Sequence, residues 1–104
     1  MEDQQYHDLF DQATRMQYKF HDYTAGQASH QPMARALQNE IHQLVQDIST
    51  ERSPRSIEDR IKTIQRQLEQ TKHVSEPFMN FNNHDDMHDN FEDMRNDVRK
   101  FTHY

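Results

Sequence analysis

The strongest candidate for metal chemistry is a run of histidine and aspartate that begins at residue 84. His84 and His88 are four residues apart, so both would lie on one face of a helix. Asp85 precedes His88 by three residues, which is the carboxylate–histidine spacing that helical bundles use to bind divalent metals. The two rings are expected beside the apolar side of this helix, and no second segment supplies a matching Glu-x-x-His. The alternative interpretation is two solvated histidines near the start of a helix.

Four aspartates in the same segment recur at intervals of four residues and would line one outer stripe of the helix: Asp85, Asp89, Asp93 and Asp97. Like charges at this spacing repel each other by a few tenths of a kcal/mol per pair. The stripe is either an acidic docking surface for a basic partner or a solvated helix face. Residues 51–75 carry a net charge of +2, with Arg55, Lys62 and Arg66 on one outer face. An acidic helix and a basic one could therefore pair within the chain or between subunits.

A short aromatic cluster, Phe78, Met79 and Phe81, interrupts a connection that is otherwise rich in polar residues. It is either a plug over one end of a core or an exposed anchor of the kind that dominates protein interfaces. Tyr18 lies outside the apolar pattern of its own segment and has the same two interpretations.

Catalytic chemistry finds little support in the sequence. A single glycine cannot build a phosphate-binding or dinucleotide-binding loop, and the absence of cysteine excludes thiol catalysis, disulfides and cysteine-ligated metals. The Asn- and Asp-rich run at residues 80–92 is not a calcium-binding EF-hand, because it lacks the required glycine and the final glutamate. We therefore expect no enzymatic activity and no cofactor.

The elements that must position these residues are helices, because the apolar residues recur every three or four positions between Gly26, Pro32, Pro54 and Pro77. The spacing predicts four helices, over about residues 4–24, 32–50, 54–73 and 83–103, with Asn82 or Asn83 as the N-cap of the last. We call the apolar line along each helix its seam. The four seams consist of Tyr6, Leu9, Phe10, Ala13, Met16, Phe20 and Tyr23; Met33, Ala34, Leu37, Ile41, Leu44, Val45 and Ile48; Ile57, Ile61, Ile64 and Leu68; and Met87, Phe91, Met94, Val98 and Phe101.

Length and composition predict a single small domain with a small core. The chain has 104 residues, and 32% of them are hydrophobic, against about 45–50% in typical soluble domains. The predicted fold is all-α: a four-helix antiparallel bundle, or helical hairpins that complete their core by oligomerising. So lean a core favours a homo-oligomer or a protein partner.

Charge and hydropathy narrow the classes of partner. The formal net charge is −6, which disfavours direct binding to nucleic acid. No stretch approaches the roughly 18 consecutive apolar residues that a membrane span requires. The first five residues are polar or acidic and no apolar signal segment follows them, so we expect a cytoplasmic protein.

The order of these segments resembles the YlbF/YmcA-type family of small helical proteins of Gram-positive bacteria. The resemblance is carried by residues 61–69, the break at Pro77, Phe78 and Met79, and Met87 with Asn90, and it covers about residues 33–101. The first helix is shorter than in that family. The resemblance implies a non-enzymatic regulator that assembles with related proteins and acts in competence, sporulation and biofilm control through RNA-processing partners. Some members bind iron–sulfur clusters through cysteines, a role that the lack of cysteine excludes here.

The leading functional hypothesis is a cytoplasmic, non-catalytic interaction or regulatory protein that associates with itself through its seams. One alternative is a bundle that binds a divalent metal through His84, His88 and Asp85. The other is a small acidic inhibitor or immunity-type protein of a mobile element, whose acidic face mimics nucleic acid.

Overall fold

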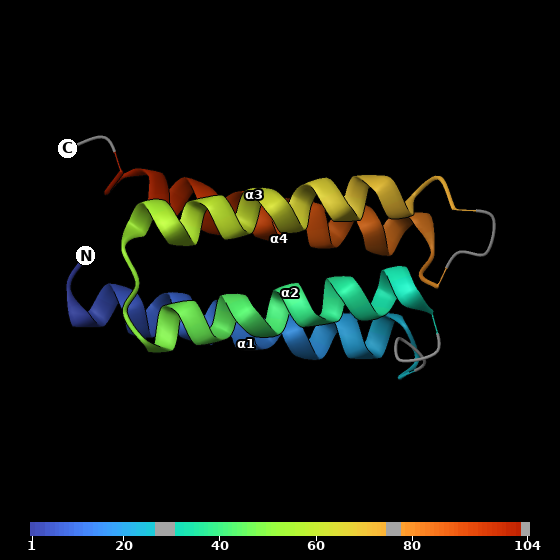
Figure 1. The fold of residues 1–104 in the computed structure, drawn as a ribbon, viewed down its shortest axis with the longest axis horizontal. Helices are drawn as coiled ribbons and strands as arrows, with labels where there is room; N and C mark the ends of the chain where they lie inside the picture. Colours follow the sequence, from blue (N-terminus) through green and yellow to red (C-terminus); the bar gives the residue numbers. More distant parts are fainter. Residues whose placement is uncertain (27–30, 75–77, 103–104) are drawn as a thin grey trace.

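In the part of the chain that the structure describes, four helices lie side by side (Figure 1). The computed structural model describes residues 1–26, 31–74 and 78–102. The helices are α1 (Asp3–Tyr23), α2 (Pro32–Ser49), α3 (Pro54–Thr71) and α4 (Phe81–Arg99), and the described residues contain no strand. The all-α prediction is therefore confirmed. Pro77, predicted as a helix break, and position 103, predicted as the end of the last helix, lie outside the described residues.

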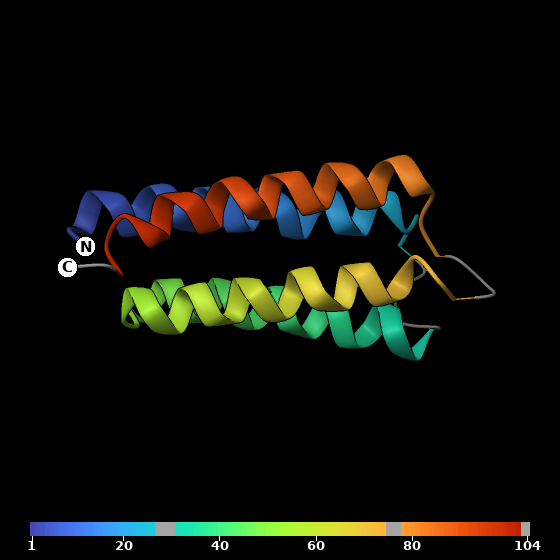
Figure 2. The same cartoon turned by 90° about the horizontal axis from the view of Figure 1, so that it is seen from above.

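Successive helices run in opposite directions, so the chain forms an up-down-up-down bundle. Each helix contacts two neighbours: α1 packs against α2 and α4, and α3 packs against α2 and α4. Two perpendicular views agree that α1 begins and α4 ends at the same end of the bundle, which we call the open end (Figures 1 and 2). The bundle measures 42 × 21 × 19 Å.

Local sequence explains where the helices begin. Both α2 and α3 start at a proline, whose fixed φ suits the first helical position. The Ser53 hydroxyl oxygen accepts a hydrogen bond from the Ser56 N–H (3.3 Å) and caps α3. In α4 the cap is Asn80, whose side-chain oxygen accepts from the Asn83 N–H at 2.8 Å. The prediction of Asn82 or Asn83 as the cap is wrong, because Asn80 already satisfies a free amide of the first turn.

The C-terminal limits differ slightly from the predictions. The last helix ends at Arg99, and residues 100–102 form a turn in place of the predicted helix. After the C-cap Thr24 both Ala25 (φ 54°) and Gly26 (φ 71°) are left-handed, and the Gly26 N–H donates to the His21 carbonyl at 2.9 Å. The left-handed position directly after the C-cap is thus Ala25, one residue before the glycine predicted to end this helix.

A single hydrophobic core runs through the bundle. Every buried apolar residue except Met79 belongs to one of the four predicted seams, and together they form one continuous cluster. The seams face one another within one chain and form its core, so self-association stays a prediction. Five seam residues lie at the margin: Phe10 and Met33 are exposed, and Tyr6, Tyr23 and Phe101 are half-buried.

Polar contacts join neighbouring helices around this core. Arg60 of α3 reaches two carboxylates of α2, with Nη1 2.7 Å from Glu40 and Nε 3.0 Å from Asp47. Between α3 and α4, the amide of Gln65 donates to Glu92 at 2.7 Å. None of the described helices is long and apolar enough to span a membrane.

Candidate binding face on α1 and α4

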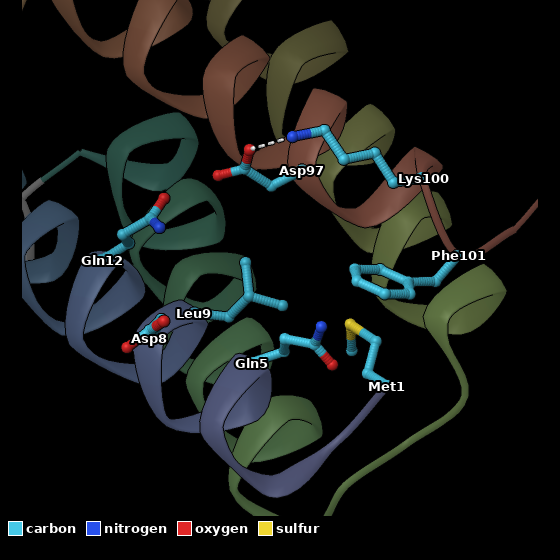
Figure 3. A pocket seen from close by; sticks show the side chains of 8 residues that line it. All are labelled: Met1, Gln5, Asp8, Leu9, Gln12, Asp97, Lys100 and Phe101. Atoms are coloured by element: carbon cyan, nitrogen blue, oxygen red, sulfur yellow. Dashed lines mark ion pairs between the residues drawn. The ribbon is translucent and has the colours of Figure 1, made fainter.

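A cavity opens between α1 and α4 at the open end of the bundle. Its volume is about 360 Å³, and it is lined by Met1, Gln5, Asp8, Leu9, Gln12, Asp97, Lys100 and Phe101. We call it the end cavity. Figure 3 shows the side chains of Met1, Leu9 and Phe101 directed into it, with Asp97 and Lys100 above them. The volume falls at the lower end of the range of about 300–1,000 Å³ that ligand pockets occupy.

Helical periodicity brings the lining residues of α1 together. Asp8 and Leu9 follow Gln5 by three and four residues and precede Gln12 by four and three, so the four residues share one side of the helix. Phe101 follows the last turn of α4 and folds back towards Leu9, so the two ends of the described chain complete the apolar wall.

A second hollow of about 320 Å³ continues along the same two helices. It is lined by Gln12, Arg15, Met16, Lys19, Asn90, Asp93 and Met94. Gln12 lines both hollows, so they adjoin along the α1/α4 contact, and we call the two together the α1/α4 groove. Of the neighbouring helix pairs, α1 and α4 are in the loosest contact.

The formal charge is distributed unevenly around the bundle. In α1 there are four aspartates against Arg15 and Lys19, a net of −2, and in α4 there are six acidic residues against Arg95 and Arg99, a net of −4. Helices α2 and α3 carry −1 and +1, which cancel. The two helices that flank the groove thus hold charge equal to the whole net charge of −6. We call this side of the molecule the acidic face.

The predicted aspartate stripe contributes to this face only in part. Asp89 and Asp93 are exposed as expected. Asp85 is half-buried and lies 2.9 Å from Nζ of Lys72, and Asp97 lines the end cavity, 3.6 Å from Nζ of Lys100. A step of four residues advances about 40° around a helix, so the stripe turns from the side facing α3 to the side facing α1. Each aspartate at an end of the stripe thus contacts a lysine while its side chain stays about half exposed, and the use of the stripe as a docking surface stays a prediction.

The basic residues predicted on the opposite helix do not meet this stripe. Arg55 and Arg66 are exposed, and Lys62 lies 3.3 Å from Glu58 of its own helix. The acidic and basic helices are joined instead by Lys72, which approaches Asp85 across the α3/α4 contact.

The predicted metal ligands do not converge. His84 is only 2% exposed, and its Nδ1 lies 3.3 Å from the Thr71 hydroxyl while Nε2 is buried without a partner. Burial lowers the pKa of His84, and the positive charge of Lys72 lowers it further. The described residues contain no group of three or more histidine, aspartate or glutamate side chains that could hold a metal, so His84, Asp85 and His88 do not form the predicted set. The alternative of two solvated histidines is also wrong for His84.

One sequence signal could have placed His84 in the core. It precedes Met87 by three residues and thus extends the seam of α4 by one turn. Its polarity argued for a surface position, whereas the structure buries it and provides the Thr71 hydroxyl as a partner.

The aromatic cluster divides between its two interpretations. Met79 is buried, and Phe78 is half-buried with its ring edge against Phe20 (6.2 Å between centroids), so both close the end of the bundle opposite the end cavity. Phe81 is 64% exposed and lies under Nζ of Lys72, 4.9 Å from the ring centroid. Only Phe81 of this cluster is thus available as an anchor. Tyr18, on the outer side of α1, is 69% exposed and is not a plug.

The structure adds a polar contact that the sequence did not indicate. The Tyr23 hydroxyl donates a short hydrogen bond to Asp86, and Nζ of Lys19 lies 3.4 Å from the same carboxylate. These contacts lower the pKa of Asp86, the Tyr23 hydrogen bond most of all. More than 60 residues separate the partners in sequence, so no local spacing reveals them.

Comparisons with known proteins leave the ancestry of this chain open. No family model, no curated protein sequence and no solved structure matches it. The resemblance to the YlbF/YmcA-type family therefore stays a prediction.

Proposed function

We propose that this chain is a non-enzymatic protein that acts by binding a basic partner protein on its acidic face. The observation that carries the proposal is the concentration of the whole net charge on the two helices that flank the α1/α4 groove. A one-sided field steers an oppositely charged protein towards one surface and orients it there. A groove beside that field offers the shape that a specific contact needs.

The titratable groups with shifted pKa values support a binding role over a catalytic one. His84 is enclosed by the core, and the carboxylate of Asp86 is occupied by Tyr23 and Lys19. Groups that act as general acids or bases must reach a substrate, usually in a cleft. Neither residue lines the end cavity. A regulatory role and a cytoplasmic location belong to the same proposal and rest on the sequence alone.

The uneven charge also favours a second candidate within the same class, a small inhibitor whose acidic face occupies the nucleic-acid site of its target. This candidate makes a separate prediction: the partner would bind either nucleic acid or this chain, and added nucleic acid would displace the chain. A partner that binds both at once would exclude it.

Paired charge reversals test the proposal. The test variant replaces the two exposed aspartates of α4, Asp89→Lys with Asp93→Lys, and the matched control makes the same change of charge on α3, Asp59→Lys with Glu69→Lys. Proteins retained by the immobilised chain are identified, purified and titrated against each variant at about 50 and 300 mM salt, where screening lengths differ more than twofold.

We expect the α4 variant to lose at least about tenfold in affinity, since reversing a charge in a complementary interface costs of the order of 1.4 kcal/mol or more. The α3 variant should bind like the wild type, and salt should weaken wild-type binding. Equal binding by both variants, or no purified protein that binds the chain, would overturn the proposal.

A further inference from the structure

We infer that the end cavity is the anchor site of this interface, and that it takes one large apolar side chain from a partner segment that carries lysine or arginine beside that side chain. The inference rests on the proposed function and specifies the chemistry of the contact. Interfaces concentrate their binding energy in a few apolar anchors that fill a pocket and are ringed by polar groups.

The apolar part of the ligand follows from the walls of the cavity. Met1, Leu9 and Phe101 direct thioether, aliphatic and aromatic groups into the same space (Figure 3). Leu9 is buried and belongs to the core, whereas Met1 and Phe101 are half-buried and border solvent. A leucine or an aromatic side chain inserted here would extend the core of the bundle by one residue and cover apolar surface that the chain leaves accessible. Methionine in the wall suits an adaptable pocket, since its side chain is flexible and polarisable.

The cationic part of the ligand follows from the rim. Asp8 is exposed at the α1 edge, and Asp97 lies at the α4 edge, 3.6 Å from Nζ of Lys100. Asp93 stands one turn further along α4, at the next hollow of the groove. Since Asp97 is paired with Lys100, a lysine or arginine next to the anchor would meet the exposed carboxylates of Asp8 and Asp93, whereas an acidic flank would be repelled by them.

A second copy of this chain fits the site less well. The exposed basic residues of α3, Arg55 and Arg66, have no exposed large apolar neighbour on that helix. Phe81 is an exposed aromatic residue, but the cation beside it, Lys72, is already paired with Asp85 and Glu69. The other exposed large apolar residues, Phe10, Tyr18 and Met33, lie on α1 and α2, whose net charges of −2 and −1 have the same sign as the acidic face. We therefore assign the site to a different protein.

Synthetic peptides test the ligand chemistry directly. The probe is a short amphipathic helix of leucine and lysine. Its two controls replace every leucine by alanine, or every lysine by glutamate. Binding is followed by methyl shifts in NMR spectra of the full chain, where the methyls of Met1 and Leu9 report on the cavity. The methyl of Met33, exposed at the start of α2, reports on non-specific contact.

We expect the leucine–lysine peptide to shift the methyl signals of Met1 and Leu9 in a saturable manner and to leave the methyl signal of Met33 unchanged. Both control peptides should bind at least about tenfold more weakly. Shifts at all three residues, or equal binding of the alanine peptide, would overturn the inference. Concentration-dependent shifts of Met1 and Leu9 without peptide would assign the cavity to a second copy and overturn it too.

Variants of the chain separate this inference from the proposed function. Gln12→Phe places an aromatic ring where the two hollows meet, and Asp8→Lys reverses a charge at the rim of the end cavity. The control, Asp59→Lys, makes the same charge change on α3. Far-ultraviolet circular dichroism checks that each variant folds. Gln12→Phe and Asp8→Lys should each lower the affinity for the leucine–lysine peptide about tenfold, whereas Asp59→Lys should leave it unchanged. A natural partner that loses affinity with the α4 charge reversals but not with Gln12→Phe would sustain the proposed function and refute the anchor site.

Discussion

Nδ1 of His84 lies 3.3 Å from the hydroxyl oxygen of Thr71 across the α3/α4 contact. The Thr71 hydroxyl also lies 2.8 Å from the Leu68 carbonyl, so it links the imidazole to the last turn of α3. His84 is 2% exposed, and protonation of its ring would place a positive charge in the core, close to the positive charge of Lys72.

This arrangement predicts that the fold loses stability in mild acid. The pKa of His84 is lowered in the folded chain, by burial first and by Lys72 second, and it is about 6.5 in the unfolded chain. Below about pH 6.5 the unfolded state therefore binds more protons, and the free energy of unfolding falls as the pH decreases towards the folded pKa. Urea titrations at about pH 7.5 and pH 5.5 measure this loss.

The control for this prediction is a second histidine at the same end of the bundle. His84→Gln should reduce the loss of stability between the two pH values, whereas His73→Gln, which changes an exposed ring, should leave it as in the wild type. An identical pH dependence in wild type and His84→Gln would show that His84 does not sense this range.

The contact between Tyr23 and Asp86 predicts a second effect in stronger acid. The hydrogen bond from the Tyr23 hydroxyl is the largest cause of the lowered pKa of Asp86, and Lys19 adds to it. The stability gained from the ionised carboxylate is present above its ordinary pKa of about 3.9 and is lost as the pH falls through the folded value. Tyr23→Phe should raise the pKa of Asp86 in a carboxyl NMR titration, and Tyr18→Phe, an exposed tyrosine of the same helix, should not.

The contacts of Arg60 predict an unusually costly substitution for a half-exposed cation. Arg60→Ala removes the hydrogen bonds to Glu40 and Asp47, and it leaves the nearly buried Asp47 carboxylate with the amide of Gln43, at 3.2 Å, as its remaining side-chain donor. We expect a loss of about 2 kcal/mol in the free energy of unfolding. Arg66→Ala, an exposed position of the same helix, should change it by no more than about 0.5 kcal/mol. Equal losses in urea unfolding would contradict the structural role of Arg60.

The cap of α4 predicts a contrast between two asparagines that are two residues apart. Asn80→Ala removes the side-chain acceptor of the Asn83 N–H and should cost about 1 kcal/mol in the free energy of unfolding. Asn82 is exposed within the first turn, so Asn82→Ala should be close to neutral. Thermal unfolding of the two variants measures the difference. If Asn82→Ala were the more damaging change, α4 would begin two residues later than the structure places it.

Much of the fold can be predicted from the spacing of the apolar residues along the chain. The steps of three and four residues that include Leu9, Leu37, Ile61 and Phe91 mark the buried side of each helix, because 3.6 residues per turn bring such positions onto one face. His84 lies on the same side of α4, three residues before Met87, so the spacing would also have predicted its burial if polar residues had been considered. Helix ends depend on single capping contacts, and for that reason the start of α4 was misplaced by two residues.

The amino-acid sequence by itself determined four amphipathic helices, their apolar seams, and the net charge of −6. Only the tertiary structure decided that α1 lies beside α4, which makes the helices with net charges of −2 and −4 neighbours and places Met1 and Leu9 against Phe101 in a common cavity. It also decided that Asp85 pairs with Lys72 and that the Tyr23 hydroxyl donates a hydrogen bond to Asp86. The physical reason is that a residue's place on its own helix follows from nearby sequence, whereas the neighbour that it meets depends on how distant helices pack.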